Sequence, residues 1–393
     1  MNTYLSRLTR RSRAPRLAGL LLGAVMLAAC GSGDEPELVS ATGGYEIWAL
    51  DQGTHIAYIY DSGLQEVGQI DLGSHGAEVP HMIEFNSNHR YAVVANVASG
   101  NVAVIRTADR EVIEVIETGP RTHMASFSHD DSRILVDVIG DADTYRDGKL
   151  VEIRADLDSE TFEIERELVI ADDPMFQDNE DRFEDVAAIC HYHNADHSQA
   201  YVSLGPDLDN GGLLVVNTDD LTIEKLWGPE DLRVNCGTML TPDGRHMLVN
   251  GGGHEVGIWY AIDTETLEVV HEASSEGIDA HGVRNLPNGE EIWMVNRGTS
   301  DGIVIDAETL EVIDTIPDTG MTPDILDFSP DSRFAFVTLR GPNPVSMPHM
   351  AKGDTPGFSV IDVESRELIG LVMPDEDNEA SDFHGIGVRV LDE

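Results

Sequence analysis

Potential metal ligands recur along this 393-residue sequence at nearly regular intervals. His81 and His123 are 42 residues apart, and Cys236 and His281 are 45 apart. Imidazole together with thiolate or carboxylate is a ligand set for copper, zinc or iron. A regular interval indicates a repeated structural unit, which would bring equivalent positions together. The residues at these positions are His81, His123, Cys236, His281, Asp324 and His384.

Similar segments begin at five of these residues. Each predicts a strand, a turn built around Asp, Asn or Gly, and a second strand. Further strands follow through turns such as "DTETLE" (263–268) and "DAETLE" (306–311). Four short antiparallel strands in about 42–45 residues predict a propeller blade. The segments are "HMIEFNSNHRYAVV" (81–94), "HMASFSHDDSRILV" (123–136), "CGTMLTPDGRHMLV" (236–249), "HGVRNLPNGEEIWMV" (281–295) and "DILDFSPDSRFAFV" (324–337).

The count of such units predicts an all-β, seven-bladed β-propeller. Six blades begin near residues 80, 122, 188, 235, 280 and 323, and residues 45–72 supply three strands of the seventh. The C-terminal "HGIGVRVL" (384–391) supplies its missing innermost strand. Closing the ring with strands from both ends removes a free sheet edge. The predicted propeller domain is residues 45–393.

The repeats resemble those of the YVTN-type propeller family. "SPDSRFAFVTLRG" (329–341), "TPDGRHMLVNGGG" (241–253) and "VNRGTSDGIVIDAETLEVI" (295–313) carry its pattern. The resemblance covers residues 45–391. It implies the fold, and it relates the chain to lactonase-like, nitrous oxide reductase-like and haem-maturation propellers, but it does not select one function among them.

Equivalent positions on the innermost strands line the central channel at one depth, so the six residues above are expected to form a ring. In the remaining blade (187–202), strict alignment places Ile189 there, and a bulge would place Cys190 or His191. His191 is 45 residues before Cys236, which favours His191.

We therefore expect a transition-metal site at His81, His123, His191, Cys236, His281, Asp324 and His384. Copper is the first candidate, and zinc or haem is the alternative. YVTN-type repeats often place Pro-His at this point, so the competing interpretation is a water-filled channel lined by repeat residues.

Long loops after the second strands are expected to gather above the ring. Arg297 and Arg340 follow second strands, and Arg284 follows the ring position of its blade. These three could hold a small anionic substrate near the axis, although salt bridges within this acidic chain are the alternative. His349, in "SMPHM" (346–350), could belong to a lid, or to an ordinary surface loop.

The N-terminus predicts export. Five arginines precede the apolar "LAGLLLGAVMLAA" (17–29), a pattern typical of a signal peptide (1–29). The apolar stretch is shorter than a typical membrane-spanning helix. "LAAC" (27–30) resembles the lipobox of bacterial lipoproteins. Cys30 is then the lipidated first residue and residues 30–44 a flexible tether. A membrane-anchored lipoprotein facing the periplasm or cell exterior is expected, with Gly31 favouring the outer membrane.

The composition excludes several classes of partner. Without residues 1–29 the chain has 20 basic and 72 acidic residues, which argues against nucleic acid or anionic lipid. The lipid anchor would be the only membrane contact. Such acidity is typical of adaptation to high salt, where charges are screened. Apart from Cys30, only Cys190 and Cys236 remain, so the exported chain is no disulfide scaffold.

Four functions remain open at this point. One is a copper-dependent redox enzyme acting on a small molecule, such as a sulfur or nitrogen anion, with an external electron-transfer partner. The second is a metal- or haem-binding protein without turnover. The third is a lactonase-type hydrolase with a ring histidine as base. The fourth is a scaffold for a partner protein.

Overall fold

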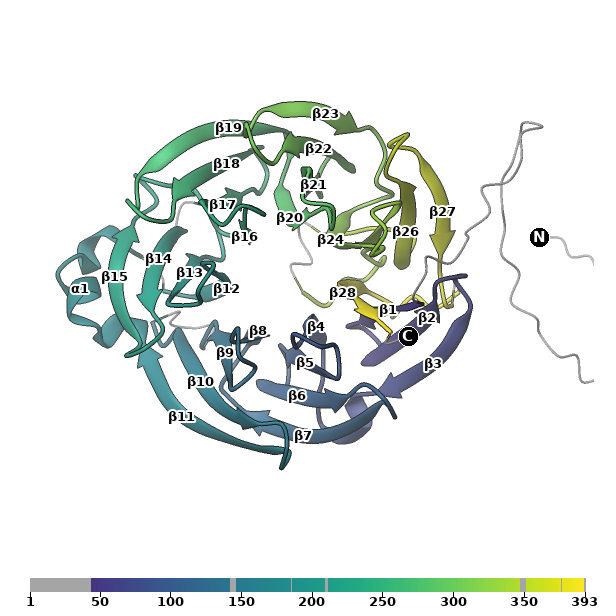
Figure 1. Cartoon of the computed structure of the whole chain (residues 1–393), viewed down its shortest axis with the longest axis horizontal. Helices are drawn as coiled ribbons and strands as arrows, with labels where there is room; N and C mark the ends of the chain where they lie inside the picture. The colour runs from purple at the N-terminus through teal and green to yellow at the C-terminus, as the bar shows by residue number, and fades with distance from the viewer. Residues whose placement is uncertain are drawn as a thin grey trace, which may run out of the picture. The chain divides into compact units, whose positions relative to one another are not determined.

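The seven-bladed β-propeller is confirmed by the computed structural model. It describes residues 44–141, 146–184, 186–208, 211–346, 351–375 and 377–391, all within one compact unit, Pro36–Glu393. Their strands form seven four-stranded antiparallel sheets in a ring, with 53% strand and 4% helix (Figure 1). None of the helices in these ranges is long and apolar enough to cross a membrane.

The first four blades, innermost strand first, are as follows. The first blade has β28 (Phe383–Val390), β1 (Tyr45–Asp51), β2 (Ile56–Asp61) and β3 (Glu66–Asp71); the second has β4 (Pro80–Phe85), β5 (Tyr91–Asn96), β6 (Asn101–Arg106) and β7 (Glu111–Glu117). The third has β8 (Thr122–Phe127), β9 (Arg133–Val138), β10 (Lys149–Asp156) and β11 (Thr161–Val169); the fourth has β12 (Ala188–His193), β13 (Gln199–Leu204), β14 (Gly212–Asn217) and β15 (Thr222–Trp227).

The last three blades follow the same order. The fifth has β16 (Thr238–Leu240), β17 (His246–Gly251), β18 (Val256–Asp263) and β19 (Val269–Ile278). The sixth has β20 (Ala280–Asn285), β21 (Glu291–Asn296), β22 (Asp301–Asp306) and β23 (Val312–Ile316). The seventh has β24 (Pro323–Phe328), β25 (Phe334–Leu339), β26 (Gly357–Asp362) and β27 (Leu368–Val372). Short helices are η1 (Gly73–His75), η2 (Ile170–Asp172), α1 (Pro174–Gln177) and η3 (Glu180–Arg182).

Strands from the two ends of the described chain close the ring, as the sequence predicts. β28 pairs antiparallel with β1, from Tyr45 opposite Val390 to Asp51 opposite Phe383. The innermost strand of the first blade is therefore the last strand of the chain, and β1 has a partner on both sides.

Aspartates fix the outer hairpins. The Oδ1 atom of Asp306 accepts hydrogen bonds from the backbone amides of Glu308 and Thr309 and from the Thr309 hydroxyl. Leu310 then takes a left-handed conformation (φ 60°), and the pairing of β22 with β23 shifts register beside it. This is a turn with a bulge, and it explains why "DAETLE" separates two strands.

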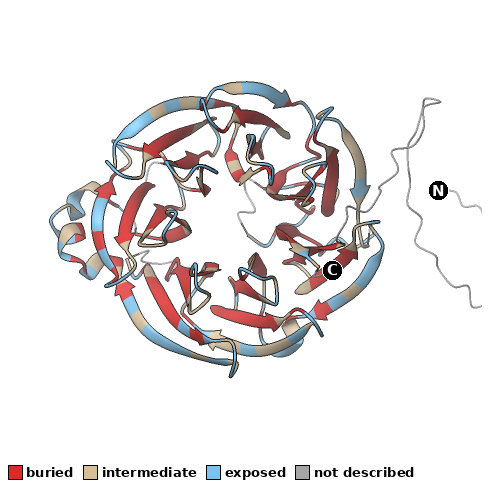
Figure 2. Cartoon of the chain, in the orientation of Figure 1, coloured by how far each residue is buried: buried red, intermediate tan, exposed pale blue. Residues whose placement is uncertain are grey.

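The inner three strands of each blade are the buried ones. Figure 2 shows buried residues along these strands and exposed residues alternating along the outer strands. Hydrophobic clusters join neighbouring blades: Val93 and Val104 of the second blade pack with Ile134 and Val151 of the third. Burial between blades stabilises the innermost strands that carry the channel residues.

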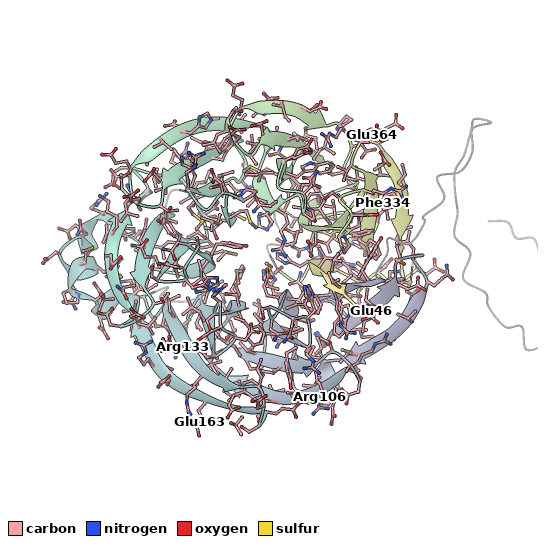
Figure 3. The ribbon with its side chains drawn as sticks, in the orientation of Figure 1. Glu46, Arg106, Arg133, Glu163, Phe334 and Glu364 are labelled. Atoms are coloured by element: carbon pink, nitrogen blue, oxygen red, sulfur yellow. The ribbon has the colours of Figure 1, made fainter. Side chains whose placement is uncertain are left out.

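Acidic residues crowd the outer rim, where Figure 3 shows Arg106 and Glu163. Arg106 lies within 2.6–2.8 Å of three carboxylates, those of Glu160, Asp109 and Glu111. The few basic groups there are shared among several acids, in keeping with the charge imbalance.

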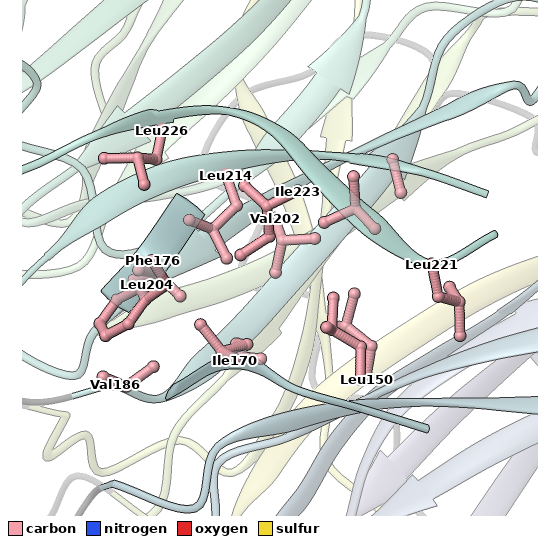
Figure 4. Packing of buried hydrophobic residues seen from close by; sticks show 14 of the residues in the cluster. Leu150, Ile170, Phe176, Val186, Val202, Leu204, Leu214, Leu221, Ile223 and Leu226 are labelled. Atoms are coloured by element: carbon pink, nitrogen blue, oxygen red, sulfur yellow. The ribbon is translucent and has the colours of Figure 1, made fainter. Parts of the chain in front are cut away.

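The acidic connection between β11 and β12 is anchored by apolar residues. Asp173 caps α1, its Oδ1 accepting from the amides of Met175 (2.7 Å) and Phe176 (3.4 Å). Phe176 and Phe183 are buried, and Figure 4 shows Phe176 beside Leu204 in the cluster between the third and fourth blades. This segment is part of the core and not only the solvated loop that its charges suggest.

Candidate metal centre

The predicted ring residues lie at the inner face of the propeller. His81 is on β4, His123 on β8, His281 on β20 and His384 on β28, while Cys236 precedes β16. These five residues line a cavity of about 480 Å³. Asp324, on β24, is fully buried behind its neighbours. The repeat register therefore brings these positions together as expected.

Three of the histidines are held in one tautomer. The Nδ1 atom of His123 lies 2.7 Å from the Ile189 carbonyl oxygen, and that of His384 lies 3.0 Å from the His81 carbonyl oxygen. His81 Nδ1 lies 2.8 Å from Oε1 of Gln52. Because these oxygens only accept, each Nδ1 carries the proton and each Nε2 keeps its lone pair. Protein ligands of metals have this arrangement.

His81 shows the consequence most clearly. Its Nε2 atom is buried and has no hydrogen-bond partner among the described residues. A buried polar nitrogen without a partner is unfavourable by about 1–3 kcal/mol. A metal ion would satisfy it.

The imidazoles are close enough to share ions. The ring centroid of His81 lies 4.1 Å from that of His123 and 3.5 Å from that of His384; His281 and His384 are 5.8 Å apart. With metal–nitrogen bonds of about 2.0–2.1 Å, the centroids of two imidazoles on one ion are about 5 Å apart. The separations of 4.1 Å and 5.8 Å lie on either side of that value, whereas His81 and His384 are stacked, with 24° between their planes, and one of these two rings would have to rotate for both to bind one ion.

Burial keeps these histidines neutral. It is the largest cause that lowers the pKa of His81 and His384 well below the usual value, and it lowers the pKa of His123 to about 4. A neutral imidazole is the form that binds metal.

Asp324 connects the other side of the ring. Its Oδ1 lies 2.8 Å from His281 Nε2, and its Oδ2 lies 2.7 Å from Arg340 Nη1 and 3.6 Å from His384 Nε2. Possible ligand atoms of His281, Asp324 and His384 all lie within 4.8 Å of one another. Burial favours the neutral acid, but His384, His281 and the arginines outweigh it, so the pKa of Asp324 is well below its usual value.

His281 contacts both a sulfur atom and a carboxylate. Its Nδ1 lies 2.5 Å from Sγ of Cys236, on the side opposite its contact with Asp324. Burial and Arg297 lower the pKa of His281, whereas Cys236 and Asp324 raise it; the net result is a pKa of about 9. The ring thus has three neutral histidines and one protonated histidine.

In the fourth blade the structure favours Cys190 over His191. A bulge lies between Ala188 and Cys190, and Cys190 Sγ is 3.9 Å from His123 Nδ1. His191 is fully buried, with Nδ1 2.5 Å from Asp137 and Nε2 2.6 Å from the Ser126 hydroxyl. Both of its nitrogens are engaged with the third blade, so His191 has no lone pair to offer an ion.

Two of the predicted substrate-binding arginines are buried in ion pairs. All three nitrogens of Arg340 are engaged, with Asp324 (2.7 Å), Asp382 (2.8 Å) and Ser346. Arg297 makes a 2.8 Å contact with Asp279 and a 3.4 Å contact with Asp324. The geometry gives both a structural role in holding Asp324.

Arg284 lies lower in the channel. It contacts Glu84 of the second blade at 3.2 Å and Asp327 of the seventh at 3.3 Å, so it spans the channel. His349, the proposed lid residue, lies outside the described residues. Four arginines line the cavity, Arg121 and the three named above, and five carboxylates pair with those three. The carboxylates are those of Glu84, Asp279, Asp324, Asp327 and Asp382.

The fold and the site define a seven-bladed β-propeller with a buried, histidine-rich candidate metal centre. Among solved structures it is similar to hydrazine synthase of Kuenenia stuttgartiensis (TM-score 0.59, 14% identity, 79% of this chain and 90% of that one). It is also similar to the dihydro-haem d1 dehydrogenase NirN in complex with DHE (TM-score 0.54, 14% identity, 90% and 77%). At this identity the likeness shows the fold. No protein-family model and no curated protein sequence matches the chain.

The metal-free protein is expected to lose stability in mild acid. Between pH 6.5 and 4 the unfolded chain binds a proton at His123 that the folded protein excludes, because the folded pKa is about 4. The free energy of unfolding should fall by about 1.6 kcal/mol from pH 6.5 to 5 on this account alone. His281 acts oppositely: its contribution is full below pH 6.5 and is lost as pH rises through about 9.

Urea unfolding at pH 6.5 and 5 measures the acid effect. The His123→Gln variant, which lacks the titrating group, should show a smaller difference between the two pH values. An identical difference in both proteins would contradict this explanation.

Proposed function

We propose that this protein binds a transition metal, copper first, at the channel ring, and that the site acts on a small molecule in the adjoining cavity. The single observation that carries the proposal is the shared tautomer of His81, His123 and His384. Each donates Nδ1–H to a protein oxygen and leaves Nε2 unprotonated.

The donor set favours a redox-active ion or an ion of intermediate softness, such as zinc. Imidazole suits copper and zinc, and thiol groups at Cys190 and Cys236 add soft donors that select for Cu(I) or zinc. Bound copper would supply electron transfer, and an external partner would then accept or deliver electrons. The enzyme names of the two similar structures agree with an enzymatic role.

A metal titration tests the proposal. Replacing His384 with glutamine removes a proposed ligand, and replacing Gln52 with leucine removes the acceptor that orients His81. Each is expected to weaken copper binding at least 10- to 100-fold in competition with a chromophoric chelator. His75, exposed in η1, provides the control: His75→Gln should bind as the wild type does. Equal affinity in all four proteins would contradict the assignment.

A second candidate is a thiol hydrolase. Cys236, His281 and Asp324 follow one another in the order of a nucleophile, base and orienting acid. Against it, the Gly237 amide, a possible oxyanion donor, is already bonded to Asn250 Oδ1 at 2.8 Å. Lactone or ester hydrolysis that survives removal of metal and disappears in Cys236→Ser would favour this candidate.

We also propose that Cys30 is lipidated and that the propeller faces the periplasm or cell exterior; Cys30 lies outside the described residues. Cys30→Ser is expected to give released protein or uncleaved precursor, whereas the wild type fractionates with membranes. Mass spectrometry of the mature N-terminus measures this directly. Cleavage elsewhere without acyl chains would disprove the anchor.

A further inference from the structure

A serine, a histidine and an aspartate are joined by hydrogen bonds between the third and fourth blades. Ser126 is on β8, the innermost strand of the third blade, and Asp137 is on β9 beside it. His191 is on β12, the innermost strand of the fourth blade. β8 and β12 are neighbours around the channel (Figure 1), so the three side chains meet where the two blades pack together.

The hydrogen bonds run in the order of a nucleophile, a base and an orienting acid. The Oγ atom of Ser126 lies 2.6 Å from His191 Nε2, and His191 Nδ1 lies 2.5 Å from Asp137 Oδ2. His191 and Asp137 are fully buried. The other carboxylate oxygen of Asp137 has no hydrogen-bond partner among the described residues, so the imidazole is what holds this buried acid.

These contacts fix the tautomer of His191. A carboxylate oxygen only accepts, so Nδ1 carries the proton, and Nε2 accepts from the Ser126 hydroxyl. An imidazole oriented by an acid in this way can take the proton of a serine that attacks a carbonyl carbon. Such a constellation is recognised by its geometry and not by its place in the sequence.

The repeat places Ser126 toward the channel. Ser126 follows the ring residue of its blade by three positions, as Glu84 and Arg284 do in theirs. Glu84 and Arg284 contact each other across the channel at 3.2 Å, so this register faces the channel. Ser126 is partly exposed, and His191, Glu84 and Arg284 line the cavity of about 480 Å³. The hydroxyl is therefore within reach of a small molecule in the channel.

Arg284 supplies a positive charge at this depth of the channel. Its contacts with Glu84 (3.2 Å) and Asp327 (3.3 Å) are longer than the 2.7–2.9 Å that is typical of charge-assisted hydrogen bonds. The guanidinium is thus free to move toward the negative oxygen that develops on a carbonyl under attack. A nucleophile of this kind requires such stabilisation of the oxyanion.

We propose that Ser126, His191 and Asp137 form a hydrolytic site for small carboxylic esters, beyond the proposed metal function and independent of any metal. Ser126 Oγ bonds to the acyl carbon while its proton passes to His191 Nε2. The ester C–O bond then breaks, and His191 gives this proton to the departing alcohol oxygen. Water, losing a proton to His191, next attacks the acyl-serine, which releases the carboxylic acid and restores the Ser126 hydroxyl.

A fluorophosphonate probe tests the nucleophile on the mature protein. The Ser126 oxygen should bond to phosphorus, with fluoride leaving and the hydroxyl proton passing to His191. Peptide mass spectrometry is expected to find the label at Ser126, both before and after treatment with a metal chelator. Ser126→Ala should lose the label, and His191→Gln should be labelled about 100-fold more slowly or worse.

Ser159 provides the matched control, because its exposed hydroxyl pairs with that of Thr161 at 3.0 Å and not with an imidazole. Ser159→Ala should be labelled as the wild type is. Hydrolysis of p-nitrophenyl acetate should fall in parallel with labelling in Ser126→Ala and His191→Gln. Circular dichroism shows whether His191→Gln is folded; Ser126→Ala removes one hydroxyl and should keep the fold.

The wild type alone can overturn the proposal. If it carries no label at Ser126, or if Ser126→Ala is labelled equally, the three residues are a polar contact between blades. A label on Cys236 in place of Ser126 would also overturn it and would favour the thiol hydrolase. The copper titration uses other variants, so the failure of either proposal can be told from the failure of the other.

Discussion

Replacing Arg340 with methionine is expected to lower the free energy of unfolding by about 3–5 kcal/mol. The Arg340 side chain is completely buried, as are Asp324 and Asp382, the two carboxylates that it joins. Methionine fills much of the space but leaves Asp382 without its guanidinium partner and removes one of two arginines from Asp324. An uncompensated buried charge is among the largest destabilising effects of a single substitution.

Arg333, at the other end of β25, gives a matched control. It is exposed and lies over the ring of Phe334, so Arg333→Met should change stability by no more than about 0.5 kcal/mol. Urea unfolding at constant salt measures both variants. If Arg340→Met lowers the free energy of unfolding by less than about 1 kcal/mol, the ion pairs of Arg340 with Asp324 and Asp382 contribute little to stability.

Deleting residues 384–393 is expected to abolish the cooperative fold. The deletion removes all of β28 except Phe383, and with it the ladder to β1 and the buried side chains of Ile386 and Val388. Each of these side chains contributes about 1.5–3 kcal/mol by burial. The open edge of β1 adds to the loss, and the total stability of a domain is only about 5–15 kcal/mol.

Thermal unfolding followed by circular dichroism measures the effect. A deletion of residues 391–393 leaves β28 intact and should retain a cooperative transition near that of the full chain. If the longer deletion melts at an unchanged temperature, the two-ended closure does not support the fold.

The fold could be predicted because it repeats. Seven units of similar length, with alternating apolar residues and turns built around Asp, Asn or Gly, leave few alternatives to a propeller. The register that aligns Phe85 with Phe127 and Phe328 also aligns His81, His123 and Asp324. For this reason most of the channel ring was visible in the spacing of residues.

Spacing failed where the backbone departs from the repeat. The bulge between Ala188 and Cys190 adds a residue that interval counting does not detect. The interval therefore selects His191, whose nitrogens bond to Asp137 and Ser126. The sequence also does not indicate that Arg297 and Arg340 are held in buried ion pairs. Their partners, such as Asp382 for Arg340, lie 42 residues away, and sequence alone does not show which charges are paired in the interior.

The buried role of Phe176 was hidden by the acidic residues on both sides of it.

The central claim is that the channel ring holds a transition metal. Elemental analysis of the protein purified from its membrane fraction, beside His123→Ala and His281→Ala, tests this most directly. We predict at least one copper or zinc ion per chain in the native protein. The two variants are predicted to contain substantially less metal. His123→Ala should be the more depleted because it removes a free Nε2, whereas His281→Ala removes the imidazole that positions Cys236 and Asp324. Native protein with substoichiometric metal, unchanged in both variants and after addition of copper or zinc, would contradict the claim.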